Sequence, residues 1–401
     1  MTELYSTFDS LKSKGRNAAD PYTYTTISYK EKSKFEQEGW VIHRKNSKSL
    51  RMKIEKERSV YFQDQVWNLF LQYQPEFING NQAIELRHHK RDERIIEVDV
   101  DYIEDEVRIV SKVFSGEDSV SKLKLFVDEI AEKKPTLSRS LSKFDDKKRK
   151  VGIVVWTDDI KLNKSLQEKL EGYGIIRLNS TELEYFQSLQ KQLGVVSKYQ
   201  FFAKLFAGQT IPELDNKVPA IKGLMGGHTY YSFSIEPETL LKLSYVLHRV
   251  NTSEDNIGAY QRMIKKKRVS EITEFLDNGG FFPNSIIINI DTKNRKPLKW
   301  DNASSSDYTS RASLGVLHLP KKYRSAFVID GQHRLYGYGG SQFRFTNTIP
   351  VVAFENLPSE LQSKLFVEIN HKQKSVPRNV LLALDSELKW NSPDADNAVS
   401  A

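Results

Sequence analysis

The stretch AFVIDGQHRLYGY, residues 326–338, decides how the C-terminal half of the chain is interpreted. Its first four residues are apolar and typical of a buried strand, and the residues after the glycine lead into a predicted helix. Between the two stand an acid, a glycine, an amide, an imidazole and a guanidinium. A helix that starts after a glycine turn presents free backbone N–H groups and the positive end of its dipole, which attract anions. The stretch therefore predicts a phosphate-binding strand–turn–helix.

Each polar residue of this turn has a role in the prediction. Gly331 and Gln332 form the turn, and His333 and Arg334 add side-chain donors. Arginine can hold a phosphate through two parallel hydrogen bonds. Asp330 can cap the helix, or hold a magnesium ion or a ribose hydroxyl, so it is the candidate for catalysis and for metal binding. The alternative is an ordinary capped helix with a surface histidine and arginine, and these residues alone do not decide between the two.

Two further groups of residues are candidates for the same site. Gln261, Arg262 and Arg268 lie on a basic stretch that is predicted to be helical. Asn370 and Gln373 lie in the predicted turn INHKQK, where their amides could read a base or a ribose. The alternatives are a solvated helix face for the arginines and an ordinary helix C-cap for Asn370.

Three blocks of the C-terminal half resemble the DGQHR-domain family, which includes the DndB-like proteins of DNA phosphorothioation systems. DGQHR with LYGY is similar to the family signature, YQRMIKKKRVSEITEFLDNGGFFPNSIIINI to its upstream block, and FVEINHKQKSVPRNVLLALDSELKW to its downstream block. The resemblance covers roughly residues 226–391. It implies a relationship to the ParB/sulfiredoxin fold, in which a G-x-x-R or G-C-H-R turn binds nucleotide phosphates.

Gly331, His333 and Arg334 fall on that family turn, whereas Gln332 replaces the sulfiredoxin cysteine and so excludes its sulfur chemistry. The resemblance therefore implies a nucleotide, ATP or another NTP with Mg²⁺, at this turn. Hydrolysis stays open, because Asp330 is the only strong metal-ligand candidate beside it.

The N-terminal half contains a predicted β-hairpin with a charged face. IIEVDVDYI and VRIVSKVF alternate apolar and polar residues on either side of an acidic turn. The pair resembles the catalytic hairpin of PD-(D/E)xK nucleases, where two acids hold magnesium and a lysine follows. Asp99 and Lys112 fit this pattern, but Val110 stands where the second acid belongs. Glu97 and Asp101 share the face of Asp99 by period two and could replace the lost ligand.

Three interpretations of this half remain open: an inactive nuclease-like fold that docks on DNA, a purely structural domain, and an active nuclease. The fold class is predicted to be α/β (α+β), with a restriction-endonuclease-like domain joined to a ParB/sulfiredoxin-like DGQHR domain. A helix over residues 119–134 is expected to stop before Pro135. The predicted divisions are a polar leader at 1–40, the nuclease-like domain at 41–190, a connecting segment at 191–225 and the DGQHR domain at 226–401.

Composition limits the classes of function. The 401 residues include no cysteine, which excludes disulfides, thiolate zinc sites and cysteine nucleophiles and suits a cytoplasmic protein. No run of 18 apolar residues predicts a membrane span. The net charge of +8 favours polyanionic partners, and basic clusters at residues 147–150 and 265–268 predict electrostatic, sequence-tolerant contact with DNA.

The sequence thus predicts a nucleotide- and DNA-binding protein of a DNA-modification or anti-phage defence system. A DndB-like, non-enzymatic DNA-binding transcriptional regulator is one alternative, and a metal-dependent nuclease is the other. Other proteins of the modification system are expected partners. A second copy of the chain is also an expected partner, since the chain stops soon after SELKW, where members of the family often continue into more helices.

Overall fold

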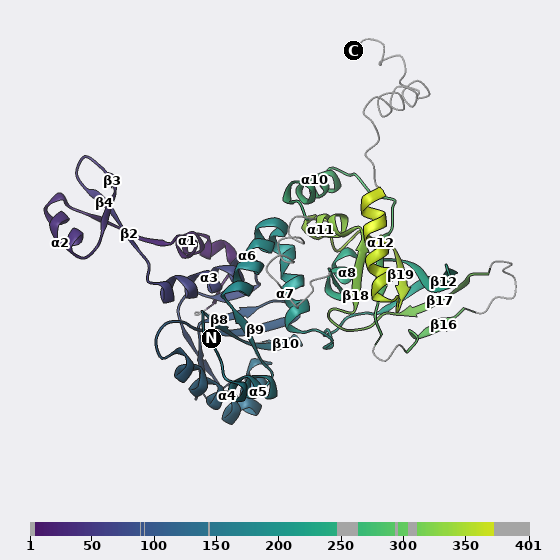
Figure 1. Cartoon of the computed structure of the whole chain (residues 1–401), viewed down its shortest axis with the longest axis horizontal. Coiled ribbons are helices and arrows are strands. Elements are labelled where there is room, and N and C mark those ends of the chain that lie inside the picture. Colours follow the sequence, from purple (N-terminus) through teal and green to yellow (C-terminus); the bar gives the residue numbers. More distant parts are fainter. Residues whose placement is uncertain are drawn as a thin grey trace, which may run out of the picture.

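The chain folds into two α/β units and a small projecting arm (Figure 1). The computed structural model describes residues 5–88, 90–91, 93–142, 145–246, 264–292, 296–303 and 311–372. The predicted mixed α/β class is confirmed, because a six-stranded and an eight-stranded sheet are both accompanied by helices.

The N-terminal unit is built on the six-stranded sheet, in the order β1-β5-β8-β9-β10-β11. β8 and β9 form the predicted antiparallel hairpin, and β10 and β11 continue the sheet in parallel with β9. The strands are β1 (Tyr5–Ser6), β5 (Phe77–Asn79), β8 (Val100–Ile103), β9 (Val107–Phe114), β10 (Lys150–Thr157) and β11 (Ile175–Asn179), with β6 (Ile84–Arg87) paired to β7 (Arg94–Val98) beside them. The helices are α1 (Phe8–Ala19), α3 (Arg58–Gln72), α4 (Ser119–Leu141), α5 (Lys164–Gly172) and α6 (Ser180–Leu193).

Two local predictions in this unit are wrong. α4 does not stop before Pro135 but continues to Leu141. Leu137 and Leu141 are buried in the core, so their packing outweighs the one backbone hydrogen bond that proline removes. The stretch IIEVDVDYI is two strands rather than one, because the pairing of the chain breaks at Asp99 between β7 and β8.

The predicted polar leader at residues 1–40 also differs from the structure. From Tyr5 onward its described part is folded, and α1 buries Leu11, Gly15 and Ala18 against α3. Residues 22–55 form the N-terminal arm, a three-stranded antiparallel sheet in the order β2-β4-β3. Its elements are β2 (Tyr22–Ile27), η2 (Tyr29–Glu31), α2 (Lys32–Gln37), β3 (Val41–Lys45) and β4 (Leu50–Glu55). The sequence did not predict the strands of the arm, because they are short and lysines on their exposed side obscure the alternation of apolar and polar residues.

The predicted connecting segment at residues 191–225 is part of the core. It contains η3 (Gly194–Ser197) and α7 (Lys198–Leu205), and seven of the eight residues of α7 are buried. Phe201 stacks on Trp156 of the N-terminal sheet, while Phe206 packs on Tyr323 of the C-terminal unit. One hydrophobic cluster therefore runs through both units.

The C-terminal unit is built on the eight-stranded sheet, in the order β14-β18-β15-β19-β13-β12-β17-β16. β18 lies between β14, to which it is parallel, and β15, to which it is antiparallel. The strands are β12 (Lys217–Met225), β13 (His228–Ile235), β14 (Ser244–Tyr245), β15 (Ile286–Ile290), β16 (Trp300–Asn302), β17 (Ser313–His318), β18 (Ala326–Asp330) and β19 (Ile349–Glu355). The helices are α8 (Pro237–Leu243), α10 (Lys266–Asp277), α11 (Gln332–Gly340) and α12 (Ser359–Lys372).

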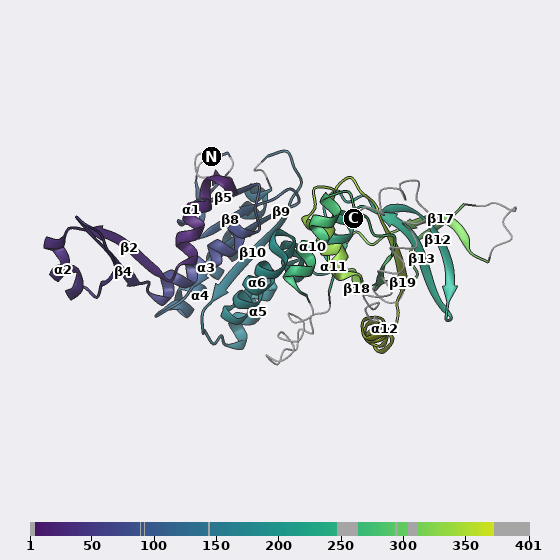
Figure 2. The same ribbon diagram turned by 90° about the horizontal axis from the view of Figure 1, so that it is seen from above.

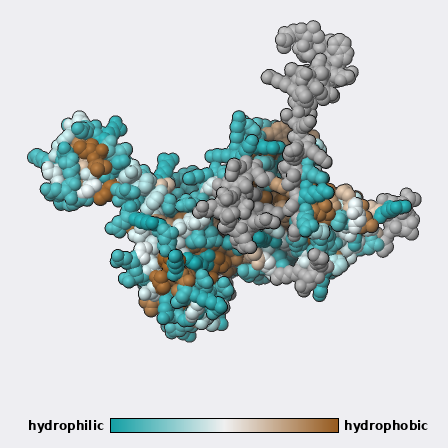
Figure 3. Space-filling model, in the orientation of Figure 1, coloured by the Kyte–Doolittle hydropathy of each residue, from teal (hydrophilic) through white to brown (hydrophobic). Residues whose placement is uncertain are grey.

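In the view of Figure 3 hydrophilic residues cover most of the described surface, with hydrophobic patches of limited extent between them. Within the described residues, no helix combines the length and the apolar character that crossing a membrane requires.

Candidate functional site

The polar turn at residues 330–334 lies at the junction of β18 and α11. Four of the five residues of β18 are buried, and the chain leaves the strand at Asp330. Gly331 then adopts φ 90° and ψ 12°, and α11 begins at Gln332. A Cβ atom at Gly331 would lie 2.5 Å from Cδ1 of Ile286, so both the backbone conformation and the close approach require glycine. The strand, the glycine and the helix stand as the sequence predicts.

Asp330 and Arg334 hold this turn together. The Arg334 guanidinium donates to the carbonyl oxygens of Asn284 (2.6 Å) and Ser285 (3.3 Å) and to the Asp330 carboxylate (3.0 Å). Of the roles considered for Asp330, capping of α11 is not observed, because Gly331 occupies the N-cap position and the Asp330 carboxylate pairs with Arg334, one turn later. Both charged groups therefore fix the start of α11 to the segment that enters β15.

His333 brings the start of α11 to the start of α10. The Nε2 atom of His333 accepts a hydrogen bond from the backbone N–H of Lys265 at 3.4 Å. Lys265 is the N-cap residue of α10, and residues 265–268 (Lys, Lys, Lys and Arg) are all exposed there. Arg268, predicted as a site residue, belongs to this group. Two helix N-termini and four cationic side chains thus lie together, which is an arrangement that favours an anion.

Gln332 adds a buried polar group at the same place. The residue is 5% exposed, and the Oε1 atom of its side chain has no hydrogen-bond partner within the described part of the chain. A buried acceptor without a partner costs free energy, about 1–3 kcal/mol. A donor on a bound ligand is one group that would satisfy it.

A cavity of about 480 Å³ lies beside these two helices. α10 and α11 pack closely, because Gly337 leaves no Cβ to meet Ile272 and Thr273 donates from Oγ1 to the Gly337 carbonyl at 3.0 Å. The end of α6 closes the cavity from the N-terminal unit, so the cavity lies where the two units meet. Its polar and charged lining residues include Gln192, Lys266, Ser270, Thr273, Glu274 and Asp277. The sequence could not indicate this cavity, since no local pattern shows which face of α10 will meet α6.

The remaining predicted residues of this site are not brought to it by the described structure. Gln261, Arg262 and Gln373 lie outside the described residues. Asn370 lies within α12 and not in a turn, because the helix continues to Lys372. Nothing is described of its side chain, so its predicted role stays a prediction.

The charged face of the β8–β9 hairpin is held by Lys112. Its Nζ atom lies 2.7 Å from Glu97 and 3.1 Å from Asp99, and Asp99 also accepts from the backbone N–H of Val113 at 2.7 Å. Burial raises the pKa of Asp99 above its ordinary value although Lys112 acts against this, whereas the hydrogen bond from Lys112 lowers the pKa of the more exposed Glu97. Lys112 thus satisfies both carboxylates.

Asp101 does not replace the missing acid. It forms a fully buried ion pair with Arg108 (2.7 Å) and also accepts from the Tyr5 hydroxyl at 2.7 Å. Val110, which lies opposite Asp101 in the sheet, is buried among apolar residues of α4 and β10. In the described ranges no three histidine, aspartate or glutamate side chains are grouped so that they could share a metal ion.

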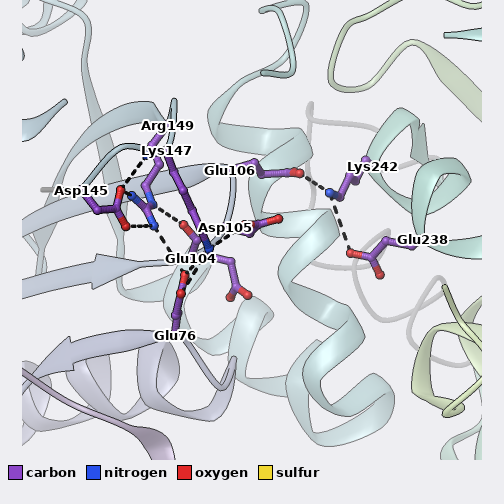
Figure 4. Close-up of polar contacts among 9 residues, drawn as sticks. All are labelled: Glu76, Glu104, Asp105, Glu106, Asp145, Lys147, Arg149, Glu238 and Lys242. Atoms are coloured by element: carbon purple, nitrogen blue, oxygen red, sulfur yellow. Dashed lines mark hydrogen bonds and ion pairs between the residues drawn. The ribbon is translucent and has the colours of Figure 1, made fainter. Parts of the chain in front are cut away.

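The basic cluster at residues 147–150 is largely neutralised. Lys147 pairs with Glu76 (3.2 Å) and Asp105 (2.9 Å), and the Arg149 side chain is 2% exposed and pairs with Asp145 (Figure 4). Charges that are already paired within the protein are poor contacts for DNA. The prediction that this cluster meets DNA loses its support. Residues 265–268 keep theirs, because they are exposed and the pair of Lys267 with Glu271, at 3.7 Å, is a surface pair.

Comparison with known proteins places the site inside a recognised region. Residues 218–389 match the sequence model of the DndB family, which is described as DNA-sulfur modification-associated. The match includes β18, α10 and α11, whereas the N-terminal arm and the six-stranded sheet precede it. No curated protein gives a significant match to the chain.

Proposed function

We propose that this protein is a DNA-binding component of a DNA-sulfur modification system, and that the start of α11 binds a phosphate group. The observation that carries the proposal is the position of the turn at Gly331 within the region that matches the DndB family. The net charge of +8 and the exposed basic residues at the start of α10 agree with a polyanionic partner.

The contacts of the turn indicate how each residue would act. Arg334 and Asp330 hold the backbone of the turn, so they are positioning residues in this proposal. The backbone N–H groups of the first turn of α11, together with His333 and residues 265–268, would then contact the phosphate. The sequence predicted that the Arg334 side chain itself binds the phosphate. In this proposal it does not, because its guanidinium already donates to Asn284, Ser285 and Asp330.

The same contacts favour binding over hydrolysis. Magnesium prefers several oxygen ligands, and the Asp330 carboxylate is already paired with Arg334 at 3.0 Å. No neighbouring acid completes a metal site among the described residues. A DNA-binding regulator of the DndB kind therefore accounts for the geometry better than an NTPase or a nuclease.

Nucleotide binding is the second candidate, and the cavity between α6, α10 and α11 favours it. A volume of about 480 Å³ lies in the range of small-molecule sites, which often form where two units meet. Ser270, Thr273 and Asp277 of its lining would supply polar contacts to a base or ribose. A thermal-shift series with ATP, GTP and CTP, each with and without Mg²⁺, tests it, and a melting temperature unchanged at millimolar nucleotide would rule it out.

DNA binding is tested by fluorescence anisotropy with a labelled 30-base-pair duplex at several salt concentrations. We expect the affinity to fall with salt at about 0.9 log unit per log unit for each phosphate contact. His333→Ala should weaken binding roughly three- to tenfold, as expected for the loss of one hydrogen-bonded contact. Lys122→Gln, an exposed lysine on α4, is the matched control and should change nothing. Absence of binding by the wild type at low salt would reject the proposal.

A further inference from the structure

We propose that the N-terminal arm is a DNA-docking module, and that the open face of its sheet contacts the phosphate backbone of duplex DNA. This inference rests on the proposed function and names the surface that carries it. Figures 1 and 2 show the arm projecting from the body of the molecule, joined to it at the base of β2 and β4. The arm lies outside residues 218–389, so the family match assigns it no role.

One face of the arm sheet is covered and the other is open. Ile27, Leu50 and Met52 are buried together with residues of and around α2, chiefly Phe35 and Trp40. Because side chains alternate along a strand, the neighbours of these residues point to the other face of the sheet. No helix of the arm covers this other face, called the open face below, so it is accessible to a binding partner.

The open face carries aromatic rings interleaved with cations. Lys53 lies opposite Tyr24, and its Nζ atom stands 3.9 Å from the ring centre of Tyr22. The guanidinium of Arg51 lies 5.0 Å from the ring centre of Tyr24, against which His43 packs edge-on. These contacts hold the cations in place on a rigid sheet, which lowers the entropy cost of binding a partner.

The charge pattern of the arm is more one-sided than that of the whole chain. Residues 41–53 contain five basic residues and no acidic one. Arg44 lies directly opposite Arg51 on the neighbouring strand, an arrangement that destabilises a sheet unless a counter-charge is present. Among the described residues no carboxylate pairs with Arg44, Arg51 or Lys53. A polyanion on this face would relieve the repulsion.

The cations of the open face differ from those of residues 147–150. There Lys147 and Arg149 are matched by acids of the same unit, and Arg149 is buried. Arg44 and Arg51 instead remain exposed and Lys53 half-exposed. These three cations of the open face are thus neither paired with a carboxylate of the described residues nor covered.

Duplex DNA fits this face better than a single strand. Proteins that bind single strands offer bare aromatic faces on which bases stack. Here Lys53 and Arg51 lie over the rings of Tyr22 and Tyr24, so the cations are in the position to meet phosphates first. Antiparallel sheets are also known elements for docking in a DNA groove.

The test compares two variants of the full-length protein with a control that removes the same number of charges. Arg44→Gln/Arg51→Gln/Lys53→Gln removes three cations of the open face. The control, Lys122→Gln/Lys124→Gln/Lys161→Gln, removes three exposed lysines of the body. We expect the arm variant to weaken duplex binding at least tenfold at about 0.1 M salt and to lower the log–log salt slope by about 2–3, while the control changes affinity less than twofold.

A second arm variant covers the case in which the first disturbs the sheet. Arg44→Gln alone removes one exposed cation of the open face, the one that lies opposite Arg51, and should lower the salt slope by about 1 without straining the sheet. Wild-type binding that none of these changes alters would overturn the role of the arm while leaving the proposed function intact. An arm-dependent preference of more than tenfold for single-stranded DNA or RNA of equal length would overturn the assignment to duplex DNA. No binding by the wild type would instead reject the proposed function itself.

Discussion

Gly331 is the residue at which the backbone limits the sequence most strictly. Its φ of 90° is unfavourable for any residue with a Cβ atom, and such an atom would lie 2.5 Å from Ile286. We therefore expect Gly331→Ala to lower the free energy of unfolding by roughly 2–4 kcal/mol, from backbone strain and overpacking together. Urea denaturation followed by circular dichroism measures the change.

Gly172 provides the matched control for this substitution. It lies at the end of α5, has no positive φ, and a Cβ atom there would meet nothing within 4 Å. Gly172→Ala should therefore leave stability within about 0.5 kcal/mol or raise it slightly. Equal effects of the two substitutions would show that position 331 does not require glycine.

At the same residue scale, the sequence predicted the turn correctly but not the contacts of its side chains. Strand, glycine and helix follow from local pattern and from the conformational freedom of glycine. The partners of Arg334 do not, because Asn284 and Ser285 are brought to it only by the pairing of β15 with β18. A side chain that the sequence predicts to bind a ligand can thus instead donate its hydrogen bonds to backbone carbonyl groups far away in the sequence.

At the scale of the element, the β8–β9 hairpin leads to a prediction about activity. Lys112 engages Glu97 and Asp99, Asp101 is paired with Arg108, and Val110 is buried. Two carboxylates that are already paired with a lysine give a weak magnesium site and cannot position a water for attack. We expect no metal-dependent cleavage of supercoiled plasmid with Mg²⁺ or Mn²⁺, measured by gel electrophoresis beside an active restriction enzyme. Nicking that disappears in Asp99→Asn would contradict this.

Sequence patterns located many helices and strands, but they did not show how tertiary packing lengthens a helix or covers a sheet. The strand before Gly331, the helix after it and the β8–β9 hairpin were predicted because their apolar patterns are strong. α4 passes Pro135 because Leu137 packs in the core, a tertiary effect that local propensity does not contain. The arm was missed because its buried positions are few, and its open face reads as an ordinary polar segment.

At the scale of the whole molecule, the acidic turn between β8 and β9 joins the two units. Glu106 contacts Lys242 of α8 (Figure 4), and it also accepts from the Tyr323 hydroxyl at 3.1 Å. Glu104 of the same turn lies 3.1 Å from Lys198 of α7. In the sequence these acids are only a turn between strands, since their partners lie about a hundred residues or more away. Together with the shared hydrophobic core, the contacts of Glu104 and Glu106 hold the two units against each other.

Lys242→Met should therefore destabilise the molecule as a whole. It leaves Glu106, whose side chain is 8% exposed, without its cation. Loss of one partner of a buried pair costs about 3–5 kcal/mol, and we expect about 2–4 here because Lys242 is partly exposed. Denaturation of this variant, of Glu106→Gln/Lys242→Met and of the surface control Lys124→Met measures the coupling. The double variant should recover part of the loss, because a neutral amide is less costly to bury than an unpaired carboxylate.

The same variant has a defined pH dependence. Burial raises the pKa of Glu106 in the folded protein above its ordinary value, although Lys242 opposes this, so removal of Lys242 should raise it further. A carboxyl with a raised folded pKa takes up its proton more readily when folded, so its penalty is present above that pKa and shrinks as the pH falls. The stability deficit of Lys242→Met should thus be largest near pH 8 and smaller near pH 5. A deficit that is constant over this range would mean that Glu106 is not left buried and charged.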